Sequence, residues 1–207
     1  MIFKDKIADI VGSSDGYTDA QAQRYILDGC YDVFNKIKAL KGLDETQKFG
    51  IWSDPAITNG NAIDIDEVHE ILYVQRNGIP ARKVTPNLVH KYTDAESIHY
   101  ASVNDPVFYF QEQYMTIKPA PAGGAEAYYI YIPTYAVTSY TSGTSSIDKF
   151  PAEYYDHILV YASIKILELI MQTYIQDEED TELAQAIAGR ITLLKQQYNE
   201  MLQIERE

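Results

Sequence analysis

Hydrophobic positions near the N-terminus recur at the spacing of a helix with one buried face. The apolar residues separated by steps of three and four are Ala22, Tyr25, Ile26, Gly29, Cys30, Val33, Phe34 and Ile37. This period places them on one side of a helix. Thr18 followed by Gln21 has the pattern of a capping box, and Gly42 suits the helix end. We predict a helix over residues 19–41, preceded by at most a short amphipathic helix over residues 2–11.

Two further helices are expected at the other end of the chain. Residues 151–175 are apolar nearly all round, which is typical of a central helix, and Pro151 fits its first turn. Residues 181–204 follow, with Thr181 as the cap. Their single apolar stripe consists of Ala184, Ile187, Ile191, Leu194, Tyr198, Met201 and Leu202. Because the helices at either end cannot bury their apolar faces alone, we expect them to pack together. The side chains expected to be buried there are Ile26, Val33, Ile158, Ala162, Leu169 and Ile191.

In the middle of the chain the pattern changes to that of strands. Residues 71–76 and 79–84 flank Asn77-Gly78, and Asn-Gly supplies the two positive φ angles of a type I′ hairpin turn. Pro80 after the turn indicates an edge strand or a bulge. Further strands are expected at residues 63–66, 107–111, 114–118 and 127–133. About six short strands in this region predict a small antiparallel sheet or sandwich.

Together these elements predict an α+β fold. An antiparallel helical bundle is formed from both chain ends, and an antiparallel β-sheet or sandwich is inserted into it. We assign residues 1–48 and 148–207 to the bundle, and residues 49–147 to the inserted β-rich subdomain.

Composition limits the partners and the compartment. The formal net charge of −13 argues against tight binding of nucleic acid, although it does not exclude DNA as a neighbour. Cys30 is the only cysteine, so no intrachain disulfide forms, which favours a reducing compartment such as the cytoplasm. The longest apolar stretch, Ile158–Met171, is short for a membrane span and contains Lys165 and Glu168. It predicts a buried helix, with no membrane contact.

No catalytic motif, cofactor motif or metal-site motif is found. The four histidines are His69, His90, His99 and His157, and they do not have metal-ligand spacing. The acidic set Asp64, Asp66, Glu67 and Glu70 does not match an EF-hand loop. We therefore predict that the chain is not an enzyme and holds no cofactor.

Tyrosine is abundant, with 18 residues, most of them between residues 92 and 161. Tyrosine suits strands, and it also suits interfaces because it combines an apolar ring with a polar tip. One alternative function is therefore a β-sandwich module that binds carbohydrate or protein, without enzymatic activity. It requires an exposed planar strip of Tyr109, Tyr114 or Tyr129. A second alternative is an enzyme with a non-local active site, which requires a deep pocket with titratable residues of shifted pKa.

Several stretches, in this order, resemble one protein family. They are Tyr17–Gln21, Glu70–Gly78, Asp105–Phe110, Met115–Pro121, and Phe150–Tyr154 leading into Leu159–Lys165. They resemble the head–tail adaptors of tailed bacteriophages, of the tail tubular protein A type. The resemblance extends over nearly the whole chain. One departure is that some adaptors have a long C-terminal arm around the portal, whereas this sequence stops at Glu207, which puts arm-based attachment in doubt.

The resemblance implies a structural virion protein in the neck or tail, assembled in the host cytoplasm. It implies a homo-oligomeric ring of twelve copies that joins the portal protein to the tail or nozzle protein. The genome would be ejected through a channel at the centre of this ring, without specific binding of DNA. The helical layer would face the portal and the β loops the tail, with no cofactor and no catalysis.

Two sets of residues are candidates for the partner interfaces. The first surrounds the predicted hairpin turn and consists of Arg76, Asn77, Gly78, Arg82 and Lys83. These basic side chains either pair with carboxylates of a neighbouring copy or form a solvated face. The second lies at the end of the last helix and consists of Tyr198, Met201 and Leu202. These residues either contact the portal or belong to the core of their own chain.

Overall fold

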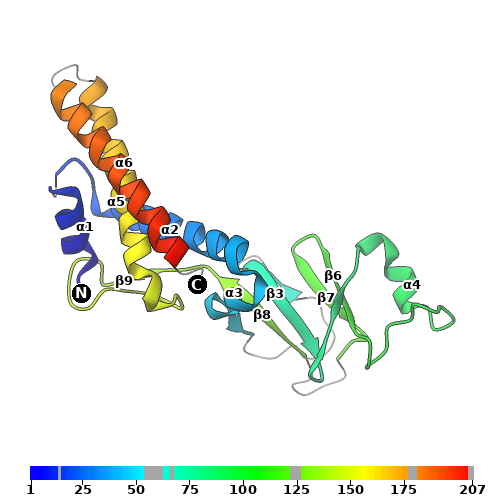
Figure 1. Ribbon diagram of the computed structural model, residues 1–207. Helices are drawn as coiled ribbons and strands as arrows, with labels where there is room; N and C mark the ends of the chain where they lie inside the picture. The colour runs from blue at the N-terminus through cyan, green and yellow to red at the C-terminus, as the bar shows by residue number, and fades with distance from the viewer. Residues whose placement is uncertain (14, 54–62, 66–67, 122–126, 177–180, 205–207) are drawn as a thin grey trace. The chain divides into compact units, whose positions relative to one another are not determined.

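The computed structural model describes residues 1–13, 15–53, 63–65, 68–121, 127–176 and 181–204 (Figure 1). The fold is α+β, as predicted from the sequence. The chain divides into two compact units. The helical unit comprises residues 1–46 and 135–207, and the middle unit comprises residues 47–134.

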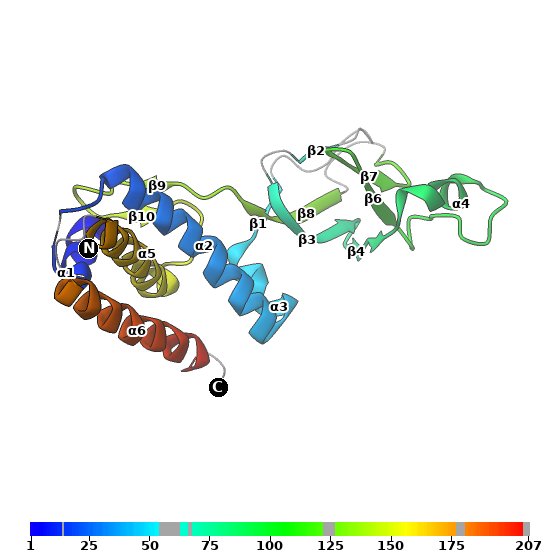
Figure 2. The same cartoon turned by 90° about the horizontal axis from the view of Figure 1, so that it is seen from above.

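The helical unit is built around one central helix. Its elements are α1 (Phe3–Val11), α2 (Asp19–Lys41), α3 (Leu43–Thr46), the 3-10 turn η3 (Ala152–Tyr154), α5 (Tyr155–Gln176) and α6 (Thr181–Ile204), with the antiparallel pair β9 (Val137–Thr138) and β10 (Ser146–Ile147). Helices α1, α2 and α6 all contact α5. Figures 1 and 2 show α6 running back beside α5. The helices from both ends of the sequence therefore share one core.

Helix α2 begins and ends where its sequence predicts. The backbone N–H of Gln21 donates to Oγ1 of Thr18 at 3.2 Å, and the N–H of Thr18 donates to Oε1 of Gln21 at 2.8 Å. This reciprocal pair satisfies two N–H groups that a helix start leaves without partners. Gly42 follows the last turn with a φ of 79°, a conformation that glycine adopts without steric cost.

Five of the six predicted core side chains are buried, namely Ile26, Val33, Ile158, Ala162 and Ile191. The prediction for Leu169 is wrong, because this side chain is only half-buried. Leu169 lies one turn from Lys165 and from Gln172, on a side of α5 that is partly open. Residues 152–175 are long and apolar enough to cross a membrane by length and composition alone, a test that core helices also pass.

Helices α2 and α5 approach each other closely at Gly29. A Cβ atom added to this glycine would lie 3.1 Å from Cδ1 of Tyr161 and 3.2 Å from Cγ2 of Ile158. Both distances are shorter than an ordinary van der Waals contact. Gly29 therefore sets how closely the two helices pack.

The chain returns from the middle unit to the helical unit earlier in the sequence than we predicted. Residues 135–147 belong to the helical unit, although we assigned them to the β-rich subdomain. The ring centre of Tyr135 lies 5.5 Å from that of Tyr31 on α2, in a tilted arrangement, and 4.9 Å from that of Phe150, in an edge-to-face arrangement. These aromatic contacts cannot be read from local strand propensity.

The described residues of the middle unit form two four-stranded sheets. The first has the order β1 (Ile51–Trp52), β8 (Ala127–Pro133), β3 (Val68–Arg76) and β4 (Ile79–Pro80). The second has the order β2 (Ile63–Asp64), β7 (Tyr114–Lys118), β6 (Val107–Gln111) and β5 (Arg82–Lys83). The shorter elements are η1 (Gln47–Phe49), η2 (Pro86–Leu88) and α4 (Val89–Thr93). Residues of both sheets meet in one apolar cluster: Val74 and Ala127 from the first, and Phe108, Met115 and Ile117 from the second.

The first and last strands of the middle unit pair with each other. Strand β1 lies antiparallel to β8, with Ile51 opposite Tyr131 and Trp52 opposite Ile130. The chain thus enters and leaves this unit through adjacent strands.

The predicted hairpin forms, but its second strand is short. Asn77 and Gly78 have φ angles of 50° and 75°, as a type I′ turn requires, and Pro80 lies on the edge strand β4. The chain then leaves this sheet. The N–H of Arg82 donates to the carbonyl of Pro106 at 2.9 Å, and the N–H of Val84 to that of Phe108 at 2.8 Å.

Strand β5 therefore runs parallel to β6, with Arg82 opposite Val107. The expectation of a wholly antiparallel β unit is wrong at this pair. A strand predicted over residues 79–84 is divided between two sheets, because the partner of its second half lies more than twenty residues away along the chain.

Candidate functional site

The predicted basic cluster does not form one exposed surface. Arg76 is only 5% exposed, because alternation along β3 places it on the same face as the buried Val74. Its Nη2 donates to the carbonyl of Ala120 at 3.4 Å. Asn77 and Gly78 are exposed at the turn. Arg76 is thus buried within its own chain, which the alternation of β3 could have revealed, and its role at a partner interface stays a prediction.

Arg82 and Lys83 are exposed, and each already has a partner in its own chain. Nη2 of Arg82 donates to Oδ2 of Asp105 at 2.9 Å, and this hydrogen bond raises the pKa of the guanidinium. The guanidinium also lies 5.5 Å from the ring centre of Tyr92. Nζ of Lys83 lies 4.7 Å from the ring centre of Phe110. A role of this pair in binding a neighbouring copy stays a prediction.

The end of α6 faces its own bundle. Tyr198 and Leu202 are buried, whereas Met201 is half-buried. The hydroxyl of Tyr198 donates to Oδ2 of Asp32 on α2 at 2.6 Å, and Nζ of Lys36 lies 4.2 Å from the ring centre of Tyr198. Burial, with a contribution from Asp32, raises the pKa of the Tyr198 hydroxyl. Tyr198 and Leu202 therefore have the intramolecular role that we left open as the alternative.

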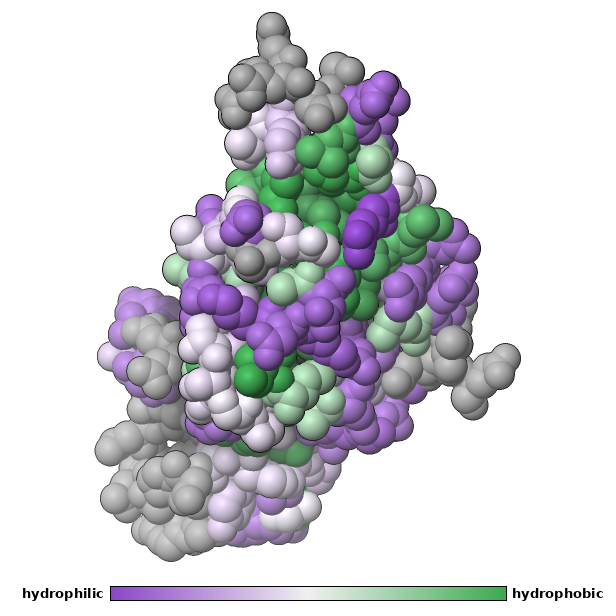
Figure 3. All heavy atoms as spheres, turned by 90° about the vertical axis from the view of Figure 1, so that its left-hand side faces the viewer, coloured by the Kyte–Doolittle hydropathy of each residue, from purple (hydrophilic) through white to green (hydrophobic). Residues whose placement is uncertain are grey.

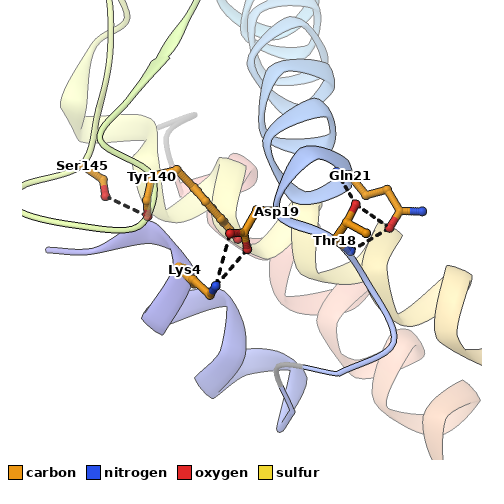
Figure 4. Close-up of polar contacts among 6 residues, drawn as sticks. All are labelled: Lys4, Thr18, Asp19, Gln21, Tyr140 and Ser145. Carbon is orange, nitrogen blue, oxygen red and sulfur yellow. Dashed lines mark hydrogen bonds and ion pairs between the residues drawn. The ribbon is translucent and has the colours of Figure 1, made fainter.

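A polar network fixes the N-terminal helix (Figure 4). Nζ of Lys4 lies 3.0 Å from Oδ1 of Asp19, at the start of α2. The N–H of Phe3 donates to Oγ of Ser145 at 2.9 Å, and the N–H of Lys4 donates to the carbonyl of Tyr140 at 3.3 Å. Burial raises the pKa of the Tyr140 hydroxyl. These contacts join α1 to α2 and to the segment before α5, which is a structural role.

The helical unit has an open apolar cleft of about 570 Å³. It lies between the α1–α2 connection, the second half of α5 and the first half of α6. The apolar side chains that line it include Val11, Leu167, Ile170, Leu183 and Ile187. Figure 3 views the molecule from the side of the helical unit and shows apolar side chains gathered in the upper part of that view.

Two charged side chains, Asp15 and Arg190, also line the cleft among the described residues. A Cβ atom at Gly12 would lie 3.3 Å from Nη1 of Arg190, so the guanidinium lies against the α1–α2 connection. No local sequence pattern indicates this cleft, because its walls come from three segments that are distant in sequence.

The middle unit presents exposed apolar side chains on one loop. In residues 94–104, hereafter the tip loop, Ile98 is 95% exposed, and Tyr100 and Val103 are also exposed. The loop nevertheless has internal order. The N–H of Glu96 donates to Oδ1 of Asp94 at 3.0 Å, and the N–H of Tyr100 donates to the carbonyl of Ser97 at 3.0 Å.

The planar tyrosine strip required by the carbohydrate-binding alternative is not formed. Tyr109 is buried, and Tyr129 is half-buried with its pKa raised by burial, so only Tyr114 of the three is exposed. A different aromatic group is exposed on the first sheet. Trp52 is 51% exposed and meets the rings of Tyr73 and Tyr128 edge-on, at 6.1 and 6.2 Å.

In the part of the chain that the structure describes, no three His, Cys, Asp or Glu residues are grouped so that they could hold a metal ion. Asp66 and Glu67 of the acidic set lie outside the described residues. Cys30 is buried, and burial raises the pKa of its thiol, in keeping with a place in the core.

One comparison with known proteins identifies a family. The family model described as SU10 adaptor protein matches residues 3–207. A search of curated proteins found no match. The family match extends through both units, and it confirms the adaptor resemblance that we drew from the sequence.

Proposed function

Because the chain belongs to the SU10 adaptor protein family, a family of phage head–tail adaptors, we propose that it forms a ring joining the portal to the tail. The observation that carries this proposal is the match over residues 3–207. The family implies a structural component of the virion that binds other virion proteins. We propose twelve copies, with the portal protein on one side, the tail or nozzle protein on the other, and the DNA exit channel through the centre. No catalytic step is part of this role.

The charge of the chain supports a channel that DNA passes without being held. At −13 per chain, the ring would repel phosphates overall. Tight non-specific binding of DNA requires clustered Lys and Arg to replace counterions. The buried Arg76, and the pairing of Arg82 with Asp105, leave fewer exposed cations near the hairpin than the sequence suggests.

The exposed apolar features support a protein with several partners. An adaptor ring needs surfaces for its neighbouring copies, for the portal and for the tail. The apolar cleft, the tip loop and the Trp52 group are three such features. Large exposed aromatic side chains are typical of protein interfaces. We further propose that the helical unit contacts the portal and that loops of the middle unit contact the tail.

The decisive experiment mixes the purified chain with portal rings of the same phage. Sedimentation and electron microscopy are expected to show a ring of adaptor chains stacked on the portal. Amide exchange is expected to slow in the helical unit when the portal is added. A chain that stays unbound at concentrations well above those of the portal would contradict the proposal.

The same sample tests the alternative of a binding module. Suppose that the chain fails to bind the portal but binds glycans, and that Trp52→Ala abolishes the glycan binding. That result would make the exposed aromatic group of the middle unit a carbohydrate site instead. We expect no such binding, because Trp52 meets Tyr73 and Tyr128 edge-on rather than forming a flat platform.

A truncation of residues 195–207 does not test portal attachment cleanly. It removes Tyr198 and Leu202, which are core residues of the bundle. Loss of portal binding would then follow from unfolding. Exchange protection in the intact chain avoids this difficulty.

A further inference from the structure

A closed ring of identical chains needs two different, complementary surfaces on each copy, because every copy meets one neighbour on each side. The described residues contain two exposed apolar features of opposite shape. One is hollow, the cleft of the helical unit, and one protrudes, the tip loop of the middle unit. They belong to different compact units.

We propose that the tip loop of one copy inserts into the apolar cleft of the next copy. In this contact, Ile98 occupies the cleft and Glu96 pairs with Arg190 of the neighbour. The inference rests on the proposed ring, and it names the lateral contact that would build it.

The tip loop has the features of an inserting element. Ile98 is 95% exposed, so nearly its whole side chain is available to a partner. The loop is also held in shape by its own hydrogen bonds, since the N–H of Ala101 donates to the carbonyl of Tyr92 at 3.0 Å, and the N–H of Ser97 to that of Asp94 at 3.0 Å. A loop that is ordered before binding loses little conformational freedom on binding.

The cleft has the features of an acceptor. Its volume of about 570 Å³ and its apolar lining, which includes Ile170 and Ile187, suit the entry of aliphatic and aromatic side chains. The cleft is bounded by helices α5 and α6, whose packing is fixed by the core of the unit. The cleft is thus present in the free chain.

The charges of the two surfaces are complementary. The tip loop has two exposed carboxylates, Asp94 and Glu96, beside Ile98. The cleft has the guanidinium of Arg190, and the carboxylate of Asp15 also lines it. In a chain with a net charge of −13, the exposed Arg190 beside an apolar cleft is a partner for Glu96, and Asp15 requires Glu96 to meet the cleft on the side of Arg190.

The test is cross-linking between copies that each have one introduced cysteine. One variant is Ile98→Cys on the tip loop, and the other is Ala186→Cys, an exposed position that lines the cleft. The native Cys30 is buried and its thiol pKa is raised, so the unmodified chain serves as the blank. Differently tagged variants are mixed at high protein concentration and treated with a short bismaleimide.

We expect about tenfold more cross-linked heterodimer than from a matched control pair, because binding raises the local concentration of the two thiols. The control pairs Ile98→Cys with Leu193→Cys, which is 68% exposed on α6 and does not line the cleft. A chain with both Ile98→Cys and Ala186→Cys is expected to give a ladder of covalent oligomers. Equal yields from the test pair and the control pair would overturn the proposal.

Charge exchange gives an independent readout. Glu96→Arg alone and Arg190→Glu alone should each lower the heterodimer yield by about fivefold, the effect of one ion pair at an interface. Mixing Glu96→Arg copies that bear the loop cysteine with Arg190→Glu copies that bear the cleft cysteine should restore the yield. Absence of this rescue would argue against the pairing of Glu96 with Arg190.

The outcomes separate this inference from the proposed function. If wild-type chains form rings on the portal but the pair of Ile98→Cys and Ala186→Cys cross-links no better than the control pair, the ring stands and its lateral contact lies elsewhere. If no ring forms on the portal, the proposed function itself fails.

Discussion

The hydroxyl of Tyr198 donates a hydrogen bond of 2.6 Å to Oδ2 of Asp32. The two residues are 166 positions apart in the sequence, on α6 and α2. Nζ of Lys36 binds the same carboxylate oxygen at 3.0 Å. This contact joins the last helix to the first long helix, although the whole middle unit lies between them in the chain.

Tyr198→Phe should therefore loosen α6 without changing the fold. A hydrogen bond to a charged acceptor contributes about 1.5–3 kcal/mol. This one is only partly buried, and Lys36 shares the carboxylate, so we expect a loss near the lower end. The melting temperature should fall by about 2–6 °C for a chain of this size. Differential scanning calorimetry measures it. Tyr174→Phe, at an exposed position, is the control and should leave the melting temperature unchanged.

Two glycines in helices should respond in opposite ways to the same substitution. Gly189→Ala places its methyl group in open space and should stabilise the chain by about 0.5–1 kcal/mol through helix propensity. Gly29→Ala gains the same propensity but crowds Tyr161 and Ile158, so it should be neutral or destabilising, and Gly29→Leu should cost at least about 1–3 kcal/mol. Urea unfolding measures all three. Equal stabilisation by both alanines would show that α2 and α5 are not in close contact.

Acidic pH should weaken the ion pair between Glu168 of α5 and Lys195 of α6. Burial raises the pKa of Glu168, but hydrogen bonds from Lys195 and Lys165 outweigh it, so the pKa lies below its ordinary value. Oε1 of Glu168 is 2.8 Å from Nζ of Lys195 on α6. A carboxylate whose pKa is lowered by folding stabilises the fold above its ordinary pKa, and this contribution disappears as the pH falls through the folded value.

Glu168→Gln should therefore lower stability at pH 7 and make it less sensitive to acid below about pH 5. Melting temperatures of both proteins between pH 7 and pH 3 measure the difference. Parallel curves for wild type and variant would contradict the role of Glu168.

Reversal of the exposed basic pair tests its predicted role in association. Arg82→Glu with Lys83→Glu should weaken binding to neighbouring copies or to the tail. The stability of the monomer should fall by less than about 1 kcal/mol, because exposed ion pairs contribute little. Sedimentation measures assembly, and Arg24→Glu with Lys149→Glu gives the same change in net charge elsewhere. If the variant with Arg82→Glu and Lys83→Glu assembles as well as the wild type, Arg82 and Lys83 form an ordinary solvated surface.

Local patterns were sufficient for the elements whose partners lie nearby in the chain. The capping pair of Thr18 and Gln21 and the three-and-four spacing after it defined α2, and Asn77-Gly78 defined a turn. In both places the sequence signal and the hydrogen bonds involve neighbouring residues. The resemblance to phage adaptors came from residue stretches in a particular order, such as Tyr17–Gln21 and Glu70–Gly78, and the family model confirms it.

Features that depend on distant partners were missed. Arg82 and Lys83 extend a strand pattern, but their hydrogen-bonding partner β6 is in the other sheet. Arg76 was expected at the surface because it is charged, whereas its guanidinium reaches the carbonyl of Ala120. The cleft required the α1–α2 connection, α5 and α6 together, so no single stretch of sequence could indicate it.

The pairing of β1 with β8 has a mechanical consequence. Both covalent links to the helical unit leave from this pair, through residues 46–47 and 134–135. A pull on the middle unit is therefore shared by two backbone connections. Because the two strands end at the same edge, they are drawn in the same direction, and the hydrogen bonds between them are not sheared. Such a link transmits tension between the two units without unzipping the pair of β1 and β8.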